Sequence, residues 1–154
     1  MTTTFIKQDA VKFAKENLDV LLIHVCNNRA VMGSGIASQI KNEIPSAFKS
    51  YRSNCSLGTV TYSHCASVAN MVAQEDYYGY QRKYDKNKRY INYGALSHCL
   101  QQIAEDFELQ DLGITRIALP KFMGADRAGG DWDIVLEMVE YYLEGIFGIV
   151  VCEL

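Results

Sequence analysis

The stretch HVCNNRAVMGSGIASQI, residues 24–40, decides the fold. It begins inside Val20–Val25, a short apolar run rich in branched residues that predicts a buried strand. A polar loop ends in Gly33–Gly35, and a helix is expected over Gly35–Ile44 because one helical face collects Ile36, Ala37, Ile40 and Ile44. A buried strand, a glycine loop and an amphipathic helix in this order are typical of an α/β sheet.

The rest of the chain repeats this alternation. Further strands are expected over Thr3–Lys7, Thr59–His64, Val68–Gln74, Arg116–Leu119 and Ile146–Cys152. Further helices are expected over Asp9–Glu16, over Ala95–Leu109 with Phe107 on its apolar face, and after Asp131 as N-cap. The strands are continuous apolar runs, so both faces of the sheet should be covered. We therefore predict one domain, residues 1–154, that forms a three-layer α/β/α sandwich around a mixed, mostly parallel sheet of about six strands.

Composition excludes several classes of protein. The chain has 154 residues, of which 49% are apolar and 21% charged, and this excludes a disordered or collagen-like chain. The net charge of -3 gives no overall basic field for nucleic acid. The apolar runs are far shorter than the roughly 20 residues of a membrane span, and no signal peptide is visible, so we expect no membrane association.

The five cysteines indicate neither a metal site nor a disulfide framework. Their positions, 26, 55, 65, 99 and 152, are widely spaced and include no CxxC pair. They are expected to be free thiols in a reducing cytosol, so the protein is expected to be cytoplasmic. No metal and no cofactor is predicted, and the chain is expected to act as a monomer.

Two glycine loops are candidates for binding phosphate. Gly33–Gly35 precedes a helix whose first N–H groups lack intrahelical partners and carry partial positive charge, which favours an anion. The stretch PKFMGADRAGGDW, residues 120–132, is again strand, glycine loop and helix. The carboxyl ends of parallel strands meet at one edge of a sheet, so the two loops can hold a diphosphate between them. Neither loop fits the Rossmann or P-loop pattern.

Four segments in order resemble the macrodomain family. Asn27 with Val31–Ala37, followed by Pro45, resembles the signature N…GVMGxGIAxxF…P. The segment Lys7–Ala10 resembles KGD at the end of the first strand, and residues 119–132 resemble PxIGxGLDRxxW. The segment Val150–Leu154 resembles the terminal strand. The resemblance spans essentially the whole chain. Within the family, the chain is similar to the subgroup that contains ADP-ribose 1''-phosphate phosphatases, terminal ADP-ribose glycohydrolases and the antitoxins of DNA ADP-ribosylating toxins.

The resemblance implies a role for each matching residue. Asp9 would accept a hydrogen bond from the adenine amino group, with the Ala10 N–H beside it; a plain helix N-cap is the alternative for Asp9. The backbone of Met32, Gly33, Ser34, Gly35 and Ile36 would surround the diphosphate and distal ribose, and the facing wall would be Pro120, Met123, Gly124, Ala125, Asp126 and Arg127. Asn27 would contact the distal ribose, as would Asn28 unless it is a turn residue.

Catalysis is expected from Asp126, with Asn27 and His24 as further candidates. A carboxylate facing the distal ribose can orient or deprotonate a water, or attack the anomeric carbon. A histidine before the loop can contact a transferred phosphate, although a satisfied core histidine is the other interpretation of His24. A solvated loop acid is the other interpretation of Asp126.

Two positions depart from the family pattern. Gln74 stands where the glycohydrolase relatives have a catalytic lysine, and an amide cannot form a Schiff base with opened ribose. Cys152 stands where relatives often have an aromatic ring against adenine, and about 1 kcal/mol of stacking is lost unless Tyr77, Tyr78 or Tyr80 supplies it.

Residues 77–93, YYGYQRKYDKNKRYINY, contain six tyrosines and five lysines or arginines. Basic residues between aromatic ones are typical of contacts with single-stranded nucleic acid. A solvated surface segment and a lid over the ligand are the alternatives.

The sequence thus favours a hydrolase that removes the phosphate from ADP-ribose 1''-phosphate. The alternatives are a glycohydrolase that removes ADP-ribose from protein or nucleic acid, and a non-catalytic ADP-ribose-binding module.

Overall fold

The computed structural model describes residues 3–33, 35–76, 89–126 and 128–154. Within these ranges one six-stranded sheet has the order β1-β6-β5-β2-β4-β3. Its strands are β1 (Thr4–Ile6), β2 (Val20–Asn27), β3 (Val60–Tyr62), β4 (Val68–Gln74), β5 (Arg116–Pro120) and β6 (Gly148–Cys152). Neighbouring strands run parallel except β3, which pairs antiparallel with β4. The mixed, mostly parallel sheet predicted from the apolar runs is confirmed.

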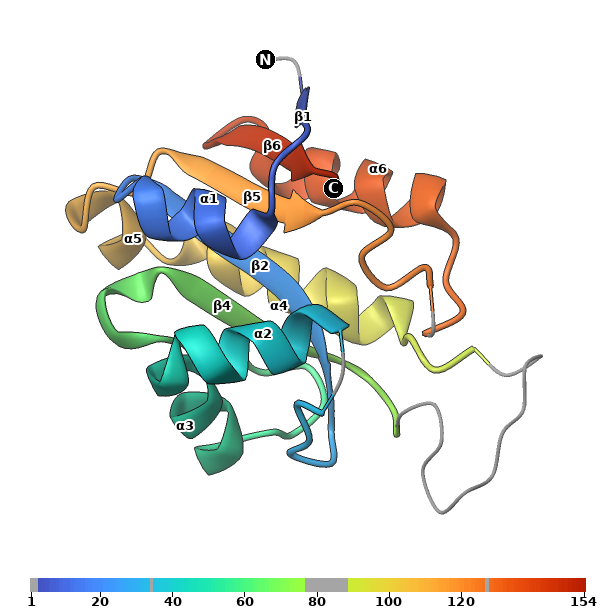
Figure 1. The fold of residues 1–154 in the computed structure, drawn as a ribbon. Coiled ribbons are helices and arrows are strands. Elements are labelled where there is room, and N and C mark those ends of the chain that lie inside the picture. Colours follow the sequence, from blue (N-terminus) through green and yellow to red (C-terminus); the bar gives the residue numbers. More distant parts are fainter. Residues whose placement is uncertain (1–2, 34, 77–88, 127) are drawn as a thin grey trace.

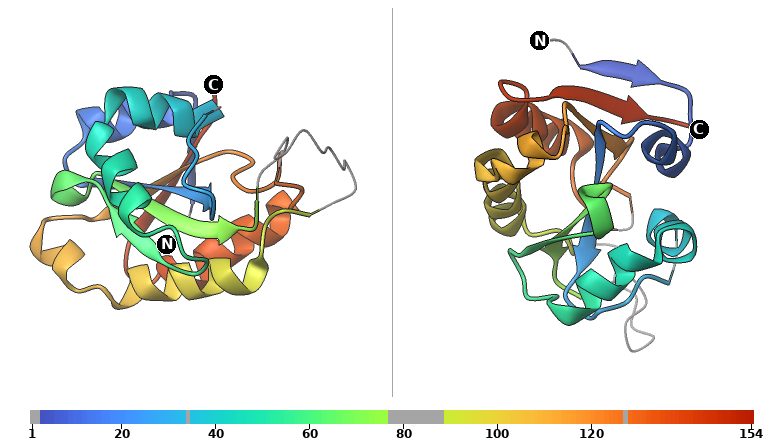
Figure 2. Two further views of the ribbon diagram at one scale, coloured as in Figure 1. Left: turned by 90° about the horizontal axis from the view of Figure 1, so that it is seen from below. Right: turned by 90° about the vertical axis from the view of Figure 1, so that its left-hand side faces the viewer.

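Helices cover both faces of this sheet (Figures 1 and 2). One face carries α1 (Ala10–Glu16), α2 (Gly35–Glu43) and α3 (Pro45–Ser53). The other carries α4 (Tyr93–Glu105), α5 (Glu108–Asp111) and α6 (Trp132–Leu143). A short 3-10 turn, His64–Ala66, joins β3 to β4. The three-layer α/β/α sandwich is therefore confirmed.

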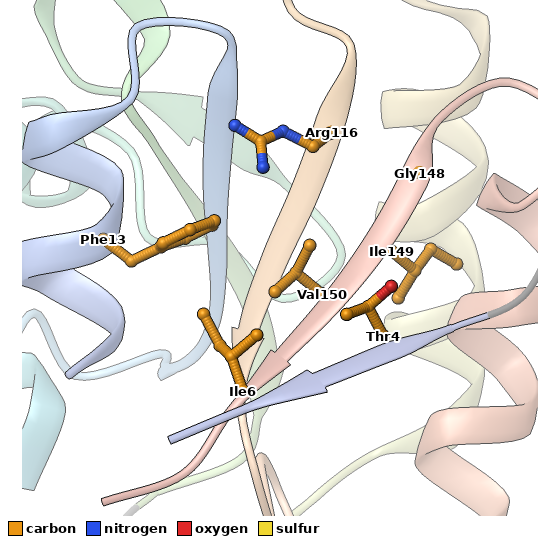
Figure 3. Close-up of a pocket in the computed structure, with 7 residues that line it drawn as sticks. All are labelled: Thr4, Ile6, Phe13, Arg116, Gly148, Ile149 and Val150. Carbon is orange, nitrogen blue, oxygen red and sulfur yellow. The ribbon is translucent and has the colours of Figure 1, made fainter. Parts of the chain in front are cut away.

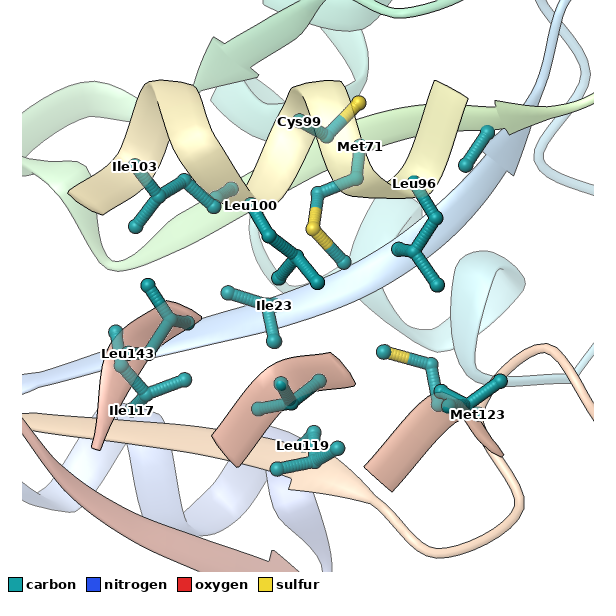
Figure 4. Packing of buried hydrophobic residues seen from close by; sticks show 14 of the residues in the cluster. Ile23, Met71, Leu96, Cys99, Leu100, Ile103, Ile117, Leu119, Met123 and Leu143 are labelled. Atoms are coloured by element: carbon teal, nitrogen blue, oxygen red, sulfur yellow. The ribbon is translucent and has the colours of Figure 1, made fainter. Parts of the chain in front are cut away.

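The central strand β2 shows why the sheet needs both layers. Leu21 and Ile23 point into the larger core beneath α4 and α6, whereas Val20 and Leu22 point into the core beneath α1 and α2. Figure 4 shows Ile23 in the larger core, between residues of α4 and residues of β5. Each of these side chains is 0–1% exposed, and burying one contributes roughly 1.5–3 kcal/mol.

The structure corrects one expected helix and adds another. The helix expected over Ala95–Leu109 ends at Glu105, and Phe107 is 72% exposed instead of lying on its apolar face. Leu109, from the separate turn α5, fills the core there. The helix α3 was not predicted, although Pro45 at its first position is a known start signal.

Candidate functional site

The loop between β2 and α2 is closed by the side chain of Asn27. Its Oδ1 accepts hydrogen bonds from the Arg29 backbone N–H (2.9 Å) and from the Tyr51 hydroxyl (2.7 Å). Its amide donates to the Val31 carbonyl (2.9 Å). Both polar ends of Asn27 are thus used within the loop, and contact with a ribose stays a prediction.

Tyr51 binds this loop from helix α3, a contact that was not predicted from the sequence. Its ring is fully buried on α3, and its hydroxyl lies 2.5 Å from the Asn27 carbonyl oxygen. The Val31 N–H donates back to the hydroxyl oxygen (3.2 Å). Burial raises the pKa of Tyr51 well above its usual value, so the phenol remains protonated and can donate. These bonds tie Asn27 and Val31 to helix α3.

The middle of the same loop leaves backbone N–H groups available. The Met32 side chain is buried beside Cys26 and Tyr51, and it anchors the loop. None of the hydrogen bonds between described residues uses the N–H of Met32 or Gly33. Gly35 has a φ of +59°, a left-handed conformation that favours glycine, and α2 begins there. These two N–H groups, which no other described residue accepts, directly precede the positive end of a helix.

The second loop, residues 120–131, requires its glycines for close packing. Gly124 has a φ of +71°, and a Cβ at that position would lie 2.6 Å from Cδ1 of Ile91. A Cβ on Gly130 would overlap the carbonyl oxygen of Gly124. Asp131 then caps α6 by accepting from the N–H groups of residues 133 and 134, as predicted.

A cavity of about 170 Å³ lies between these loops, at the carboxyl ends of β2, β4 and β5. Its lining residues are His24, Val25, Ile36, Gln74, Pro120, Lys121, Phe122, Met123, Gly124, Asp126 and Ala128. Asp126 and Gln74, from different segments, thus meet at one cavity, and Gln74 Nε2 donates to the Asp76 carbonyl (3.1 Å). Ligands in parallel sheets bind outside this edge.

His24 is held in the sheet next to this cavity. The Asn70 amide donates to the Ala47 carbonyl (3.0 Å) and to Thr61 Oγ1 (3.1 Å), so its Oδ1 faces His24 Nε2 at 2.7 Å. The Nε2 atom therefore carries the proton and donates it to Asn70. Burial lowers the pKa of His24 to about 4, and the ring is neutral at pH 7. A catalytic role for His24 stays a prediction.

The other predicted end of the site lies at the N-terminus of α1. The Asp9 carboxylate caps this helix by accepting from the Lys12 N–H (3.0 Å), and Ala10 beside it is buried. It also accepts from Gln39 Nε2 of α2 (3.0 and 2.8 Å). Burial and the charge of Asp9 raise the pKa of the nearby Cys152 thiol to about 11.

A groove of about 330 Å³ separates α1 from α2 at this end. It is lined by Asp9, Lys12, Lys15, Glu16, Gln39 and Glu43. The first turn of α2 carries Ile36 to the cavity between the loops, and the next turn carries Gln39 to this groove. The cavity therefore meets the first turn of α2, whereas the groove follows the helix from its second turn to its last residue, Glu43.

Asn28 joins the first loop to the end of β4. Its N–H donates to the Gln74 carbonyl (3.0 Å), and its Oδ1 accepts from the Asp76 N–H (2.9 Å). Arg29 pairs with Asp76 at 2.5 Å. These contacts agree with the alternative of Asn28 as a turn residue. Ser34, Arg127 and residues 77–88 of the tyrosine-rich segment lie outside the described residues.

A larger cavity, about 430 Å³, lies elsewhere on the α1 side of the sheet (Figure 3). It is lined by Thr4, Ile6, Phe13, Arg116, Gly148, Ile149 and Val150. Arg116 and Gly148 are the first residues of β5 and β6, so this cavity reaches the edge opposite the glycine loops. The guanidinium of Arg116 already pairs with Asp19 at 2.9 Å, and we assign the cavity no ligand.

Solved structures resemble this arrangement along the whole chain. A protein of unknown function from Bacteroides thetaiotaomicron superposes with a TM-score of 0.83 at 23% identity, covering 100% of this chain and 99% of that one. A macrodomain protein from Streptomyces coelicolor superposes with a TM-score of 0.74 at 20% identity, covering 99% of each chain. The chain has the macrodomain fold.

Two further comparisons extend this result. Thermosipho africanus DarTG in complex with ADP-ribose matches the macrodomain fold of this chain with a TM-score of 0.71 at 14% identity, covering 100% of this chain and 42% of that one. No family model matches the sequence. An uncharacterized 17.5 kDa protein from the tk-vs intergenic region of Enterobacteria phage T4 is 27% identical over 149 residues, which is 92% of this chain and 90% of that protein.

The macrodomain fold thus brings the predicted residues to one edge of the sheet, in two groups. His24, Ile36, Pro120, Met123, Gly124 and Asp126 line the cavity, whereas Asp9, Ala10 and Cys152 lie at the α1 end. Sequence reasoning missed Gln39, Tyr51, Lys121 and Phe122, although Gln39 lies one helical turn after Ile36 and was open to that inference.

Over the described ranges, no group of three or more His, Cys, Asp or Glu residues can hold a metal ion. None of the helices described there is long and apolar enough to cross a bilayer.

Proposed function

We propose that this protein binds ADP-ribose derivatives and removes the phosphate from ADP-ribose 1''-phosphate. The observation that carries the proposal is that α2 lines two hollows, the cavity with its first turn and the groove with its later turns. The base lies in the groove beside Asp9, the diphosphate crosses the free N–H groups of the first loop, and the distal ribose enters the cavity with Asp126. A ligand with two ends and a charged centre matches this order of surfaces.

The similarity to solved structures supports the choice of ligand. One of the structures that share the fold is a complex with ADP-ribose. Its identity to this chain is 14%, and the two hollows that α2 lines in this protein support the same ligand independently.

In the proposed reaction, water attacks the phosphorus atom and the bond between phosphorus and the 1''-oxygen breaks. Asp126 orients the water, accepts its proton and passes that proton to the departing 1''-oxygen, giving ADP-ribose and inorganic phosphate. Gln74 lines the same cavity, and in the proposed reaction the second N–H of its amide, beside the one that bonds the Asp76 carbonyl, donates to a phosphoryl oxygen. His24 remains neutral and positions the end of β2 through Asn70.

A non-catalytic ADP-ribose-binding module is the second candidate. Gln74 favours it over a glycohydrolase that depends on lysine, because an amide cannot form a Schiff base at the cavity.

The test measures release of inorganic phosphate from ADP-ribose 1''-phosphate, alongside calorimetric titration with ADP-ribose. We expect Asp126→Asn to lower turnover at least ~100-fold while ADP-ribose affinity changes less than about threefold. Asp133→Asn, an exposed acid on α6, serves as the matched control. Binding without phosphate release would establish the module instead, and failure to bind ADP-ribose would reject both functions.

A further inference from the structure

The base end of the site contains a hydrogen-bonded pair of side chains from two helices. Gln39 Nε2, on α2, lies 3.0 Å from Oδ1 and 2.8 Å from Oδ2 of Asp9, which caps α1. Both residues line the groove between the helices and are partly exposed. Asp9 thus presents itself to a ligand together with Gln39.

The pair leaves mainly acceptors free. The amide N–H₂ of Gln39 is directed to the carboxylate, and among the described residues no hydrogen bond uses its Oε1. A carboxylate has about four lone-pair positions, so Asp9 can accept further after the bonds from Lys12 and Gln39. Burial alone would raise the pKa of Asp9, but its hydrogen bonds with the Lys12 backbone and Gln39 outweigh burial, so the pKa lies below its usual value. The carboxylate is ionised at pH 7 and only accepts.

Purine bases differ at the edge that such a surface would contact. Adenine carries an amino group, a donor, at the position where guanine and hypoxanthine carry a carbonyl oxygen, an acceptor. Two acceptors facing an amino group are satisfied, whereas two acceptors facing a carbonyl leave buried polar atoms unpaired. The polarity of the pair therefore favours adenine.

We propose that Gln39 is a base-specificity residue: held by Asp9 through its amide N–H₂, it presents Oε1 to the exocyclic amino group of adenine. This inference rests on the proposed function, because it requires the base to occupy the groove between α1 and α2. It assigns to Gln39 a role in choosing the base and none in catalysis.

The experiment compares affinities for ADP-ribose and for its hypoxanthine analogue by calorimetry. We expect the wild type to bind ADP-ribose at least ~10-fold more tightly, and Gln39→Met to reduce this ratio about fivefold. Gln101→Met, an exposed glutamine on α4, is the matched control and should keep the wild-type ratio. A residue with only a structural role would change both affinities equally.

A double-mutant cycle with Asp9→Ala adds a second readout. If the two side chains act together, Asp9→Ala and Gln39→Met should change the selectivity ratio less together than the product of their separate effects. An unchanged ratio in Gln39→Met, or tighter ADP-ribose binding, would overturn the inference and leave the proposed function intact. Failure of the wild type to bind either nucleotide would overturn both.

Discussion

Acidification should destabilise this protein through His24. Its folded-state pKa is about 4, against about 6.5 for an exposed histidine, because the ring is buried and only partly compensated by Asn70. Between pH 6.5 and pH 4, His24 is therefore protonated in the unfolded chain but neutral in the folded protein. Stability from the neutral ring is fully present above pH 6.5 and is lost as the pH falls toward 4.

The size of the effect follows from the two pKa values. A difference of about 2.5 pH units corresponds to about 3 kcal/mol, and about 2.5 kcal/mol of it should be lost between pH 7 and pH 4.5. The carboxylates of Asp9 and Asp19 also have lowered pKa values, but their contribution is lost mainly below this window. His24 should therefore dominate the slope between pH 6.5 and pH 4.5.

Urea unfolding followed by the fluorescence of Trp132, the single tryptophan, measures this slope. His24→Gln keeps a donor for Asn70 and should flatten the slope, even if its stability at pH 7 is lower. His98→Gln, an exposed histidine on α4, should retain the wild-type slope. Equal slopes in the wild type and His24→Gln would refute the assignment of a buried neutral ring.

Two substitutions test how the glycine loops are fixed. Tyr51→Phe should cost about 1–3 kcal/mol in urea unfolding, because it leaves the polar groups of Asn27 and their neighbours without the buried hydroxyl, whereas the exposed Tyr141→Phe should cost almost nothing. Gly130→Ala should lower stability by about 3 kcal/mol, because its methyl group would overlap the loop's own backbone; Gly145→Ala has open space and is the control. Unchanged midpoints in Tyr51→Phe or Gly130→Ala would contradict the packing described for these loops.

The order of strands and helices was accessible from local patterns. Val20–Val25 and Val68–Gln74 are apolar runs of strand length, and Asp131 is a cap residue before an apolar helical face; the structure has these elements at those places. The prediction for Phe107 was wrong because its helical spacing from earlier apolar residues carries no information about Asp106, where the backbone leaves the helix. Local spacing describes one segment, whereas burial depends on what packs against it.

The sequence by itself determined the fold class, the two glycine loops and the acid Asp126 in the second loop, because strand length, helical period and backbone-permissive residues are local properties. Only the tertiary structure decided the partners: Tyr51 under Asn27, Gln39 on Asp9, and Asn70 against His24. These pairs join residues 24, 30 and 46 positions apart, and their contacts depend on how α2 and α3 pack on the sheet and on the pairing of β2 with β4. Such packing is a collective result of burying many apolar side chains, and no single segment encodes it.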